Sequence, residues 1–193
     1  MFKIKGLRKR WLLNTVGIVS VLGLVCVLIV TLVFGAYYQS AMESDMRYRA
    51  RTTTEFFADY LNQSYKEYYQ SCITYAQTFE DKNTIELQFI NAQGQIVASS
   101  YGQWAGRSPN TRDISDAVLT RAPSTYVGRD EATGERIMAV SCPMIYSNGE
   151  VIGVLRYITS TAAIDRQILV IALCAVGAFL VILAAVMFSG RFF

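Results

Sequence analysis

The sequence predicts an α+β fold in which one folded domain lies between two transmembrane helices. Three observations support this prediction: two long apolar segments, a helical repeat of apolar residues after the first of them, and short runs of alternating apolar and polar residues further on. Steps of three and four are typical of an amphipathic helix, and strict alternation is typical of a half-buried strand. We therefore expect a long N-terminal helix and an antiparallel sheet of about five strands.

The two apolar segments have the length and composition of membrane spans. Apolar residues make up 52% of the chain and are concentrated at Val16–Ala36 and Ile168–Phe188, where no residue is charged. About 20 such residues in a helix cross the ~30 Å hydrocarbon core of a bilayer. The segment between them is too short to enclose two such helices in a core. We therefore assign residues 11–38 and 168–190 to transmembrane helices and residues 39–167 to the domain.

Basic residues set the expected orientation in the membrane. Five of them lie in residues 1–10, Arg191 follows the second span, and all 15 acidic residues lie between the spans. Because short basic flanks stay on the cytoplasmic side, residues 1–10 and 191–193 are expected in the cytoplasm. The domain is then expected outside the cytoplasmic (inner) membrane. The alternative is a cleaved signal peptide, although its apolar core usually has only about 7 to 15 residues.

The residues after the first span predict that its helix continues into the domain as a long stalk. Between Gln39 and Lys82 the chain contains neither proline nor glycine, so nothing signals a break. An apolar stripe recurs there at steps of three and four. Its members are Phe57, Leu61, Tyr65, Tyr68, Cys72, Tyr75 and Phe79. Two interpretations stay open: packing on the sheet, and contact with the same helix of a second subunit.

The next segment predicts a β-hairpin. Apolar and polar residues alternate from Ile85 to Phe89, and the alternation resumes at Ile96 and Ala98. Asn91–Gly94, between the two runs, has the composition of a turn.

A loop and a short helix separate this hairpin from three further strands. The polar loop Tyr101–Arg112 leads to a helix expected over residues 113–120, with Asp113 as its N-cap. The strands are expected at residues 124–129, 135–146 and 150–160. Asn148–Gly149 signals a tight turn before the last strand. That strand is apolar on both faces, so we expect it in the middle of the sheet or covered on both faces.

Four cysteines divide evenly between the spans and the domain. Cys26 and Cys174 lie in the spans, whereas Cys72 and Cys142 lie in the part expected in an oxidising compartment. A disulfide between Cys72 and Cys142 and a pair of small buried thiols are both open.

Two stretches of the domain resemble a known family. The hairpin IELQFINAQGQIVASS and the stretch SCPMIYSNGEVIGVLRY resemble the first hairpin and the final strands of the Cache and PAS-like extracytoplasmic sensor domains of bacteria. The resemblance covers most of residues 84–160. Met187–Phe193 is similar to the end of the second span in membrane sensor histidine kinases. These likenesses imply the N-terminal sensor region of a two-component sensor histidine kinase.

The resemblance also implies partners. It implies a homodimer in the lipid bilayer, a small-molecule or envelope ligand, and a cytoplasmic response regulator reached only through a kinase core. The chain contains no histidine that could accept a phosphoryl group, so we expect the input part of a receptor, truncated after the second span.

No arrangement of residues predicts catalysis. Histidine, the commonest acid-base and metal-binding residue, is absent, and the cysteines lack the spacing of metal ligands. Paired acids such as Asp130–Glu131 lie beside turns and are expected to be solvated. We therefore expect no catalytic site, metal, cofactor or nucleic-acid partner, and no enzymatic activity in this chain.

The resemblance suggests where a ligand would bind. In the family the pocket lies on the sheet face away from the long helix, which implies contributions from Trp104, Tyr126 and Arg156. For Trp104 and Tyr126 the alternative is ordinary core packing. A buried guanidinium needs an anionic partner. For Arg156 this would be a carboxylate ligand, or a protein acid such as Glu86 or Glu150.

Three functions stay open at this point. The first is signal reception that feeds a histidine kinase. The second keeps the receptor but has a different output, as in a chemoreceptor or a cyclic-dinucleotide enzyme. The third is a non-signalling envelope assembly protein that binds a partner and transmits nothing.

Overall fold

The chain divides into two compact units. The computed structural model describes residues 5–60, 65–102, 106–130 and 133–192. One unit comprises Met1–Gln39 and Ala163–Phe193, and the other comprises Ser40–Ala162. The first unit contains the apolar segments, and the second is the domain.

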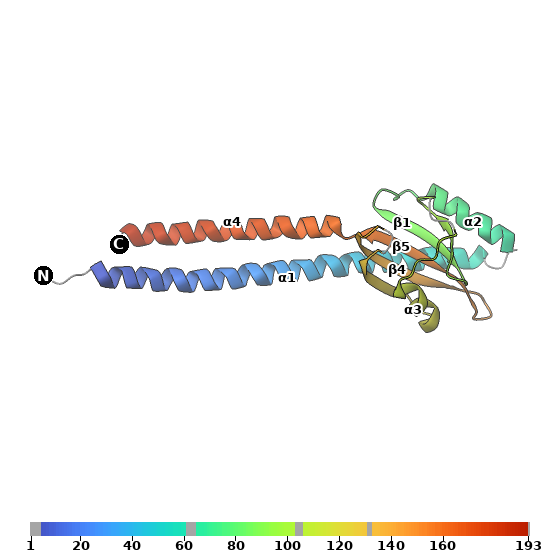
Figure 1. Cartoon of the computed structure of the whole chain (residues 1–193), viewed down its shortest axis with the longest axis horizontal. Coiled ribbons are helices and arrows are strands. Elements are labelled where there is room, and N and C mark those ends of the chain that lie inside the picture. Colours follow the sequence, from blue (N-terminus) through green and yellow to red (C-terminus); the bar gives the residue numbers. More distant parts are fainter. Residues whose placement is uncertain (1–4, 61–64, 103–105, 131–132, 193) are drawn as a thin grey trace. The chain divides into compact units, whose positions relative to one another are not determined.

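The elements follow the predicted order (Figure 1). The helices are α1 (Lys5–Tyr60), α2 (Tyr65–Thr78), α3 (Arg112–Thr120) and α4 (Ala162–Phe192). The strands are β1 (Ile85–Asn91), β2 (Ile96–Ser99), β3 (Ser124–Arg129), β4 (Arg136–Ile145) and β5 (Val151–Ser160). They form one antiparallel sheet in the order β2-β1-β5-β4-β3. The predicted α+β fold with five strands is therefore confirmed, and so is the central position of the last strand.

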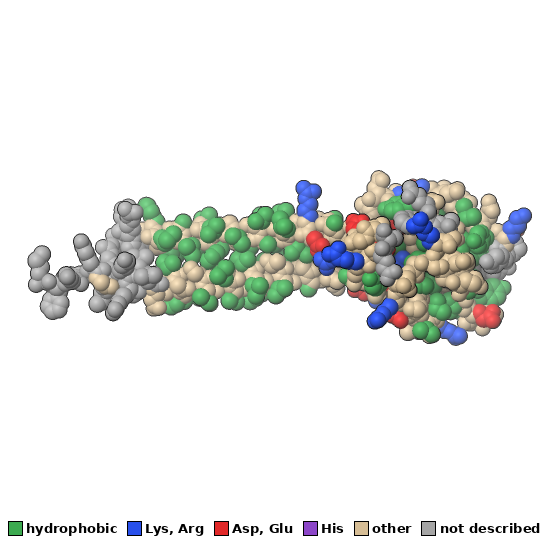
Figure 2. All heavy atoms as spheres, viewed as in Figure 1, with side chains coloured by type: hydrophobic (Ala, Val, Ile, Leu, Met, Phe, Trp, Pro, Cys, Tyr) green, Lys and Arg blue, Asp and Glu red, His purple; other side chains and the backbone are tan. Residues whose placement is uncertain are grey.

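Both predicted spans lie within long helices. Helices that are long and apolar enough to cross a membrane occur at Asn14–Ala58 within α1 and at Ala162–Phe188 within α4. Their most apolar parts have mean hydropathies of 3.0 and 3.1, and no residue there is buried. Hydrophobic side chains cover both helices (Figure 2). The ring of Phe179 fills the space that a side chain at Gly23 would need, a close approach that small residues permit between membrane helices.

The main core of the domain lies between one face of the sheet and helices α1 and α2. On this face Phe89, Leu155 and Tyr157 are at most 2% exposed. From α1, the ring of Phe57 lies 5.0 Å from the ring of Phe89. The hydroxyl of Thr53 lies 3.0 Å from the hydroxyl of Tyr157. Each fully buried side chain of this size stabilises the fold by about 1.5–3 kcal/mol.

Helix α1 continues past the first apolar segment as far as Tyr60, as predicted, but a separate helix α2 then runs back along it, so the helical stretch to Lys82 is not one unbroken stalk. The ring of Phe57 lies 5.3 Å from that of Tyr75, and the guanidinium of Arg49 lies 2.6 Å from the carboxylate of Asp81. A straight helix over residues 40–82 would be about 65 Å long, whereas a strand of ten residues spans about 33 Å. A single helix of this length would extend beyond the ends of the strands, so part of its apolar stripe would not contact the sheet. Two antiparallel helices allow the whole stripe to pack against the same sheet.

The described members of the predicted stripe all pack in this core. They are Phe57, Tyr68, Cys72, Tyr75 and Phe79, of which Tyr75 and Phe79 are partly buried. Leu61 and the side chain of Tyr65 lie outside the described part of the chain. The stripe thus contributes to sheet packing, while contact with a second subunit stays a prediction.

Helix α3 covers part of the opposite face of the sheet. Its residue Ile114 joins Ile90, Ile96 and Val154 in a small apolar cluster. This cluster covers one end of the face only, so the other end is left for the polar groups described below.

Candidate ligand site on the sheet

A row of polar residues crosses all five strands on the face opposite the main core. The strand register aligns, in order, Ser99, Gln88, Arg156, Ser141 and Ser124. Side chains that pair across antiparallel strands point to the same face. Gln88, Arg156 and Ser141 are at most 4% exposed, and buried polar groups of this kind need partners inside the protein.

Arg156 is the centre of a buried hydrogen-bond network. Its Nε donates to Asp113 Oδ2 over 2.8 Å, and its remaining nitrogens donate to Thr111 Oγ1 over 2.8 Å and Gln88 Oε1 over 3.3 Å. Ser141 Oγ donates to the same Asp113 oxygen over 2.6 Å. The anionic partner of Arg156 is thus a protein acid, as one interpretation predicted. The acid is Asp113, however, and neither Glu86 nor Glu150.

Asp113 is not the N-cap of the short helix, as the sequence predicted. That position belongs to Thr111, whose extended backbone has φ −114° and ψ 147° and whose side chain makes no capping bond. Asp113 is the second residue of α3, where a carboxylate interacts favourably with the positive end of the helix dipole. Its Oδ1 is buried and has no hydrogen-bond partner among the described residues.

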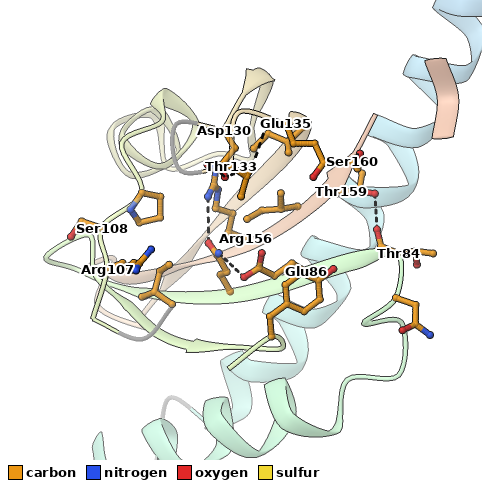
Figure 3. A pocket seen from close by; sticks show the side chains of 17 residues that line it. Thr84, Glu86, Arg107, Ser108, Asp130, Thr133, Glu135, Arg156, Thr159 and Ser160 are labelled. Atoms are coloured by element: carbon orange, nitrogen blue, oxygen red, sulfur yellow. Dashed lines mark hydrogen bonds between the residues drawn. The ribbon is translucent and has the colours of Figure 1, made fainter. Parts of the chain in front are cut away.

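A pocket of about 400 Å³ lies beside this network. Its wall comes from β1, β5, the segment after β2 and the β3–β4 connection (Figure 3). Arg107 and Ser108 line one side, and Glu86 lines another. Across the pocket from Glu86 lie Asp130 and Glu135 with Thr133 between them in sequence. Pockets of about 300–1,000 Å³ are the size that small ligands occupy.

Three carboxylates of the pocket wall form no ion pair within the described residues. Glu86 Oε1 accepts hydrogen bonds from Gln88 Nε2 over 2.8 Å and from Ser99 Oγ over 2.7 Å. Glu135 Oε1 accepts from Ser160 Oγ over 2.5 Å. Asp130 Oδ2 accepts from the backbone N–H and the hydroxyl of the threonine three residues later. Among the described residues, each carboxylate thus accepts hydrogen bonds through only one of its two oxygens.

The pKa of the Tyr101 hydroxyl is affected by the charges of the pocket wall. Burial raises the pKa of this hydroxyl, and the negative charges of Glu86 and Glu135 raise it further. Both carboxylates therefore act on this hydroxyl. Their charges disfavour any further negative charge, such as that of an anionic ligand, at this part of the wall.

The structure gathers only one of the three predicted ligand residues in the described pocket. Arg156 lines it. Tyr126 lies on β3, where its hydroxyl donates to the carbonyl of Arg129 over 3.1 Å and its ring covers Gly128. Trp104 lies outside the described residues.

Glu86, Tyr101 and Glu135 were not predicted as pocket residues, although part of the signal was present. Glu86 is on the same face of its strand as Gln88, opposite the apolar Ile85 and Leu87. A polar strand face beside a predicted pocket could therefore have identified Glu86. Tyr101 and Glu135 lie at chain turns, where no periodicity indicates a direction.

Cys72 and Cys142 are free thiols, so of the two alternatives the structure has the buried pair and not the disulfide. Burial raises the pKa of Cys72 to about 12 and also raises that of Cys142. Because the thiolate is the reactive form, both side chains are protonated and unreactive near neutral pH.

We expect iodoacetamide at neutral pH to leave Cys72 and Cys142 unmodified in the folded chain. Unfolding in urea should expose both thiols and make both peptides alkylated in mass spectrometry. A peptide pair linked through these two cysteines, recovered without added oxidant, would contradict the free-thiol assignment.

Comparison with known proteins identifies the domain. Residues 74–160, a little under half of the chain, match the family model described as the Cache domain of the WalK sensor protein kinase. These residues form a Cache sensor domain. The match includes the end of α2, helix α3, the whole sheet and the Cache pocket wall from Asn83 to Ser160. Two apolar helices flank the Cache domain, as in the predicted membrane sensor.

Solved structures with the same fold come from bacterial proteins. The sensor domain of the Vibrio cholerae histidine kinase DctB has a TM-score of 0.56 and 18% identity, over 70% of this chain and 55% of that one. The ligand-binding domain of the Pseudomonas aeruginosa PAO1 amino acid chemoreceptor PctC, in complex with GABA, has a TM-score of 0.51 and 17% identity, over 79% and 66%. The periplasmic domain of RsbU from Chlamydia trachomatis has a TM-score of 0.50 and 14% identity, over 76% and 56%.

These likenesses show the fold of the Cache domain. The chain spans about half to two thirds of the length of the solved structures that it matches. No curated protein matches the chain. Sensing is therefore the role that the Cache family supports, while the output and the ligand are matters for the proposal below.

Proposed function

We propose that this chain is the extracytoplasmic sensing and transmembrane transmission part of a two-component sensor histidine kinase. The observation that carries the proposal is continuity along the chain. Ile158, Thr159 and Ser160 line the pocket at the end of β5, and α4 begins two residues later at Ala162. A ligand in the pocket therefore contacts the residues that lead directly into the second apolar helix.

The end of β5 is attached to both sides of the pocket. Thr159 Oγ1 donates to the carbonyl of Thr84 over 2.7 Å, and Ser160 Oγ donates to Glu135 over 2.5 Å. The backbone N–H of Thr161 donates to the carbonyl of Arg136 over 2.9 Å. A ligand that binds one arrangement of these bonds better than another shifts the strand end. The size of the signal is bounded by the difference between the two affinities.

The proposal includes an orientation and partners. The basic flanks support an orientation with both termini in the cytoplasm and the Cache domain outside the inner membrane. A homodimer would bring two copies of each span together, and a kinase core would connect the sensor to a cytoplasmic response regulator. A chemoreceptor could use the same sensor with a different output, because PctC shares the fold.

A chimeric receptor tests the transmission step. We would join a histidine kinase core of known activity after Phe193 and measure its autophosphorylation in membrane vesicles with and without a mixture of small metabolites. The chimera is expected to respond to the mixture. Ile158→Trp, which fills the pocket, should abolish the response, because the added ring occupies the ligand volume.

A matched control uses the same new side chain at another place. Leu119 on α3 is 81% exposed and does not line the pocket, so Leu119→Trp should leave the response unchanged. A chimera that ignores every metabolite, or an Ile158→Trp chimera that responds normally, would count against the proposed function.

A further inference from the structure

We propose that the pocket binds an organic cation, a small molecule that carries amine groups, between the carboxylates of Glu86 and Glu135. This inference rests on the proposed function, since it takes the pocket to be the ligand site of the sensor. It departs from the interpretation in which Arg156 attracts a carboxylate ligand. The argument depends on charge, on unused hydrogen-bond acceptors and on the size of the pocket.

The charges of the pocket wall do not favour an anion. Glu86, Asp130 and Glu135 contribute three carboxylates, and Arg107 and Arg156 contribute two guanidiniums. The charge of Arg156 is already neutralised by the buried carboxylate of Asp113, 2.8 Å away. This leaves Arg107 as the cation that can balance the three carboxylates. Even when Arg107 is counted at full charge, the pocket wall has two negative charges in excess.

Arg156 has little capacity left for a ligand. Its three nitrogens all donate to protein oxygens, and its carboxylate partner Asp113 is fully buried. These bonds use three of its five N–H groups, and Asp113 already balances its charge. An anionic ligand on the two remaining N–H groups would therefore meet a guanidinium whose charge is already neutralised, beside the negative charges of Glu86 and Glu135.

The three carboxylates of the pocket wall, in contrast, each have an oxygen that can accept further hydrogen bonds. Glu86 Oε2, Glu135 Oε2 and Asp130 Oδ1 accept no hydrogen bond from the described residues. Glu86 lies on the opposite side of the pocket from the other two (Figure 3). A molecule with two separated donors could therefore bond both sides at once. Hydrogen bonds from an ammonium to a carboxylate are about twice as strong as neutral ones.

The arrangement suits an organic cation better than a metal ion. No group of three or more potential metal ligands occurs among the described residues. A metal ion would also leave most of a pocket of about 400 Å³ unfilled. A short aliphatic diamine fills more of this volume and places its methylene groups near the apolar side chains of Ile96, Ile137 and Ile158.

Three probes of equal chain length and different charge test the inference on the whole chain in lipid nanodiscs. They are 1,4-diaminobutane, 4-aminobutanoate and succinate, measured by isothermal titration calorimetry. We expect 1,4-diaminobutane to bind at least tenfold more tightly than succinate, with 4-aminobutanoate between them. Glu86→Gln and Glu135→Gln should each weaken diamine binding about tenfold, because each loses one charge-assisted hydrogen bond.

The control is Glu150→Gln, which removes the same charge at the β4–β5 turn, outside the pocket lining. Its diamine affinity should stay within twofold of the unmodified chain. Stronger binding of succinate, or diamine binding that survives in the Glu86→Gln/Glu135→Gln double variant, would overturn the cation inference and leave the sensor role standing. If none of the three probes binds, the cation inference fails as well, and the chimeric receptor still decides the proposed function.

Discussion

Arg156→Met is expected to lower the free energy of unfolding by about 3–5 kcal/mol, because it leaves the carboxylate of Asp113 buried without a counter-charge. The side chains of the pair are 3% and 0% exposed, so water cannot replace the missing guanidinium. Methionine keeps most of the volume, so the loss reports on charge and hydrogen bonding and not on a cavity. Urea unfolding of the chain in detergent, followed by circular dichroism, measures the change.

Two further variants separate the ion pair from other effects. Arg51→Met removes an arginine whose pair with Glu55 is 75% and 66% exposed, and it should change stability by less than about 0.5 kcal/mol. The double variant Asp113→Leu/Arg156→Met replaces the whole buried pair by apolar groups and should recover most of the loss. A single Arg156→Met variant as stable as the unmodified chain would show that the network contributes nothing.

The position of Arg156 on a central strand could be predicted from the sequence, but its partner could not. Apolar residues on both faces of the last strand indicated a central position, and the structure confirms it. Asp113, however, is 43 residues away from Arg156 in the chain. Which acid reaches the guanidinium depends on how α3 lies over the sheet, and no local pattern contains that information.

The end of α1 was missed for a different reason. Glycine and proline, the strongest signals of a helix end, are absent around Leu61. The weaker signal, Ser64 with Glu67 at the spacing of a capping box, was not used. The apolar stripe also keeps its helical steps from Phe57 to Phe79, because both helices use it against the same sheet. A continuous pattern therefore fits one helix and two antiparallel helices equally well.

The strand order shows a similar limit. Alternating residues identified each strand and the first hairpin, since these depend on near neighbours in the chain. The pairing of β1 with β5 joins Ile85 to Thr159 across most of the domain. This pairing places Glu86 beside Ile158 and so creates the pocket, but it follows from the packing of the whole sheet.

Phe57→Ala is expected to cost about 3–5 kcal/mol of the free energy of unfolding, the usual range for a buried phenylalanine. Phe57 is 1% exposed, and its ring lies 5.0 Å from that of Phe89 and 5.3 Å from that of Tyr75. The variant therefore removes the contact that joins α1 to both the sheet and α2. The same unfolding measurement, repeated at several protein concentrations, gives the size of the loss and its dependence on association.

Phe56 supplies the matched control for this experiment. It is the same residue type one position earlier and is 51% exposed, so Phe56→Ala should cost less than about 1.5 kcal/mol. The described contacts of Phe57 lie within one subunit. The loss of unfolding free energy in Phe57→Ala should therefore not change with protein concentration. A loss that disappears on dilution would mean that dimerisation supplies the stability. The stripe would then serve mainly as the contact between subunits, the second of its two interpretations.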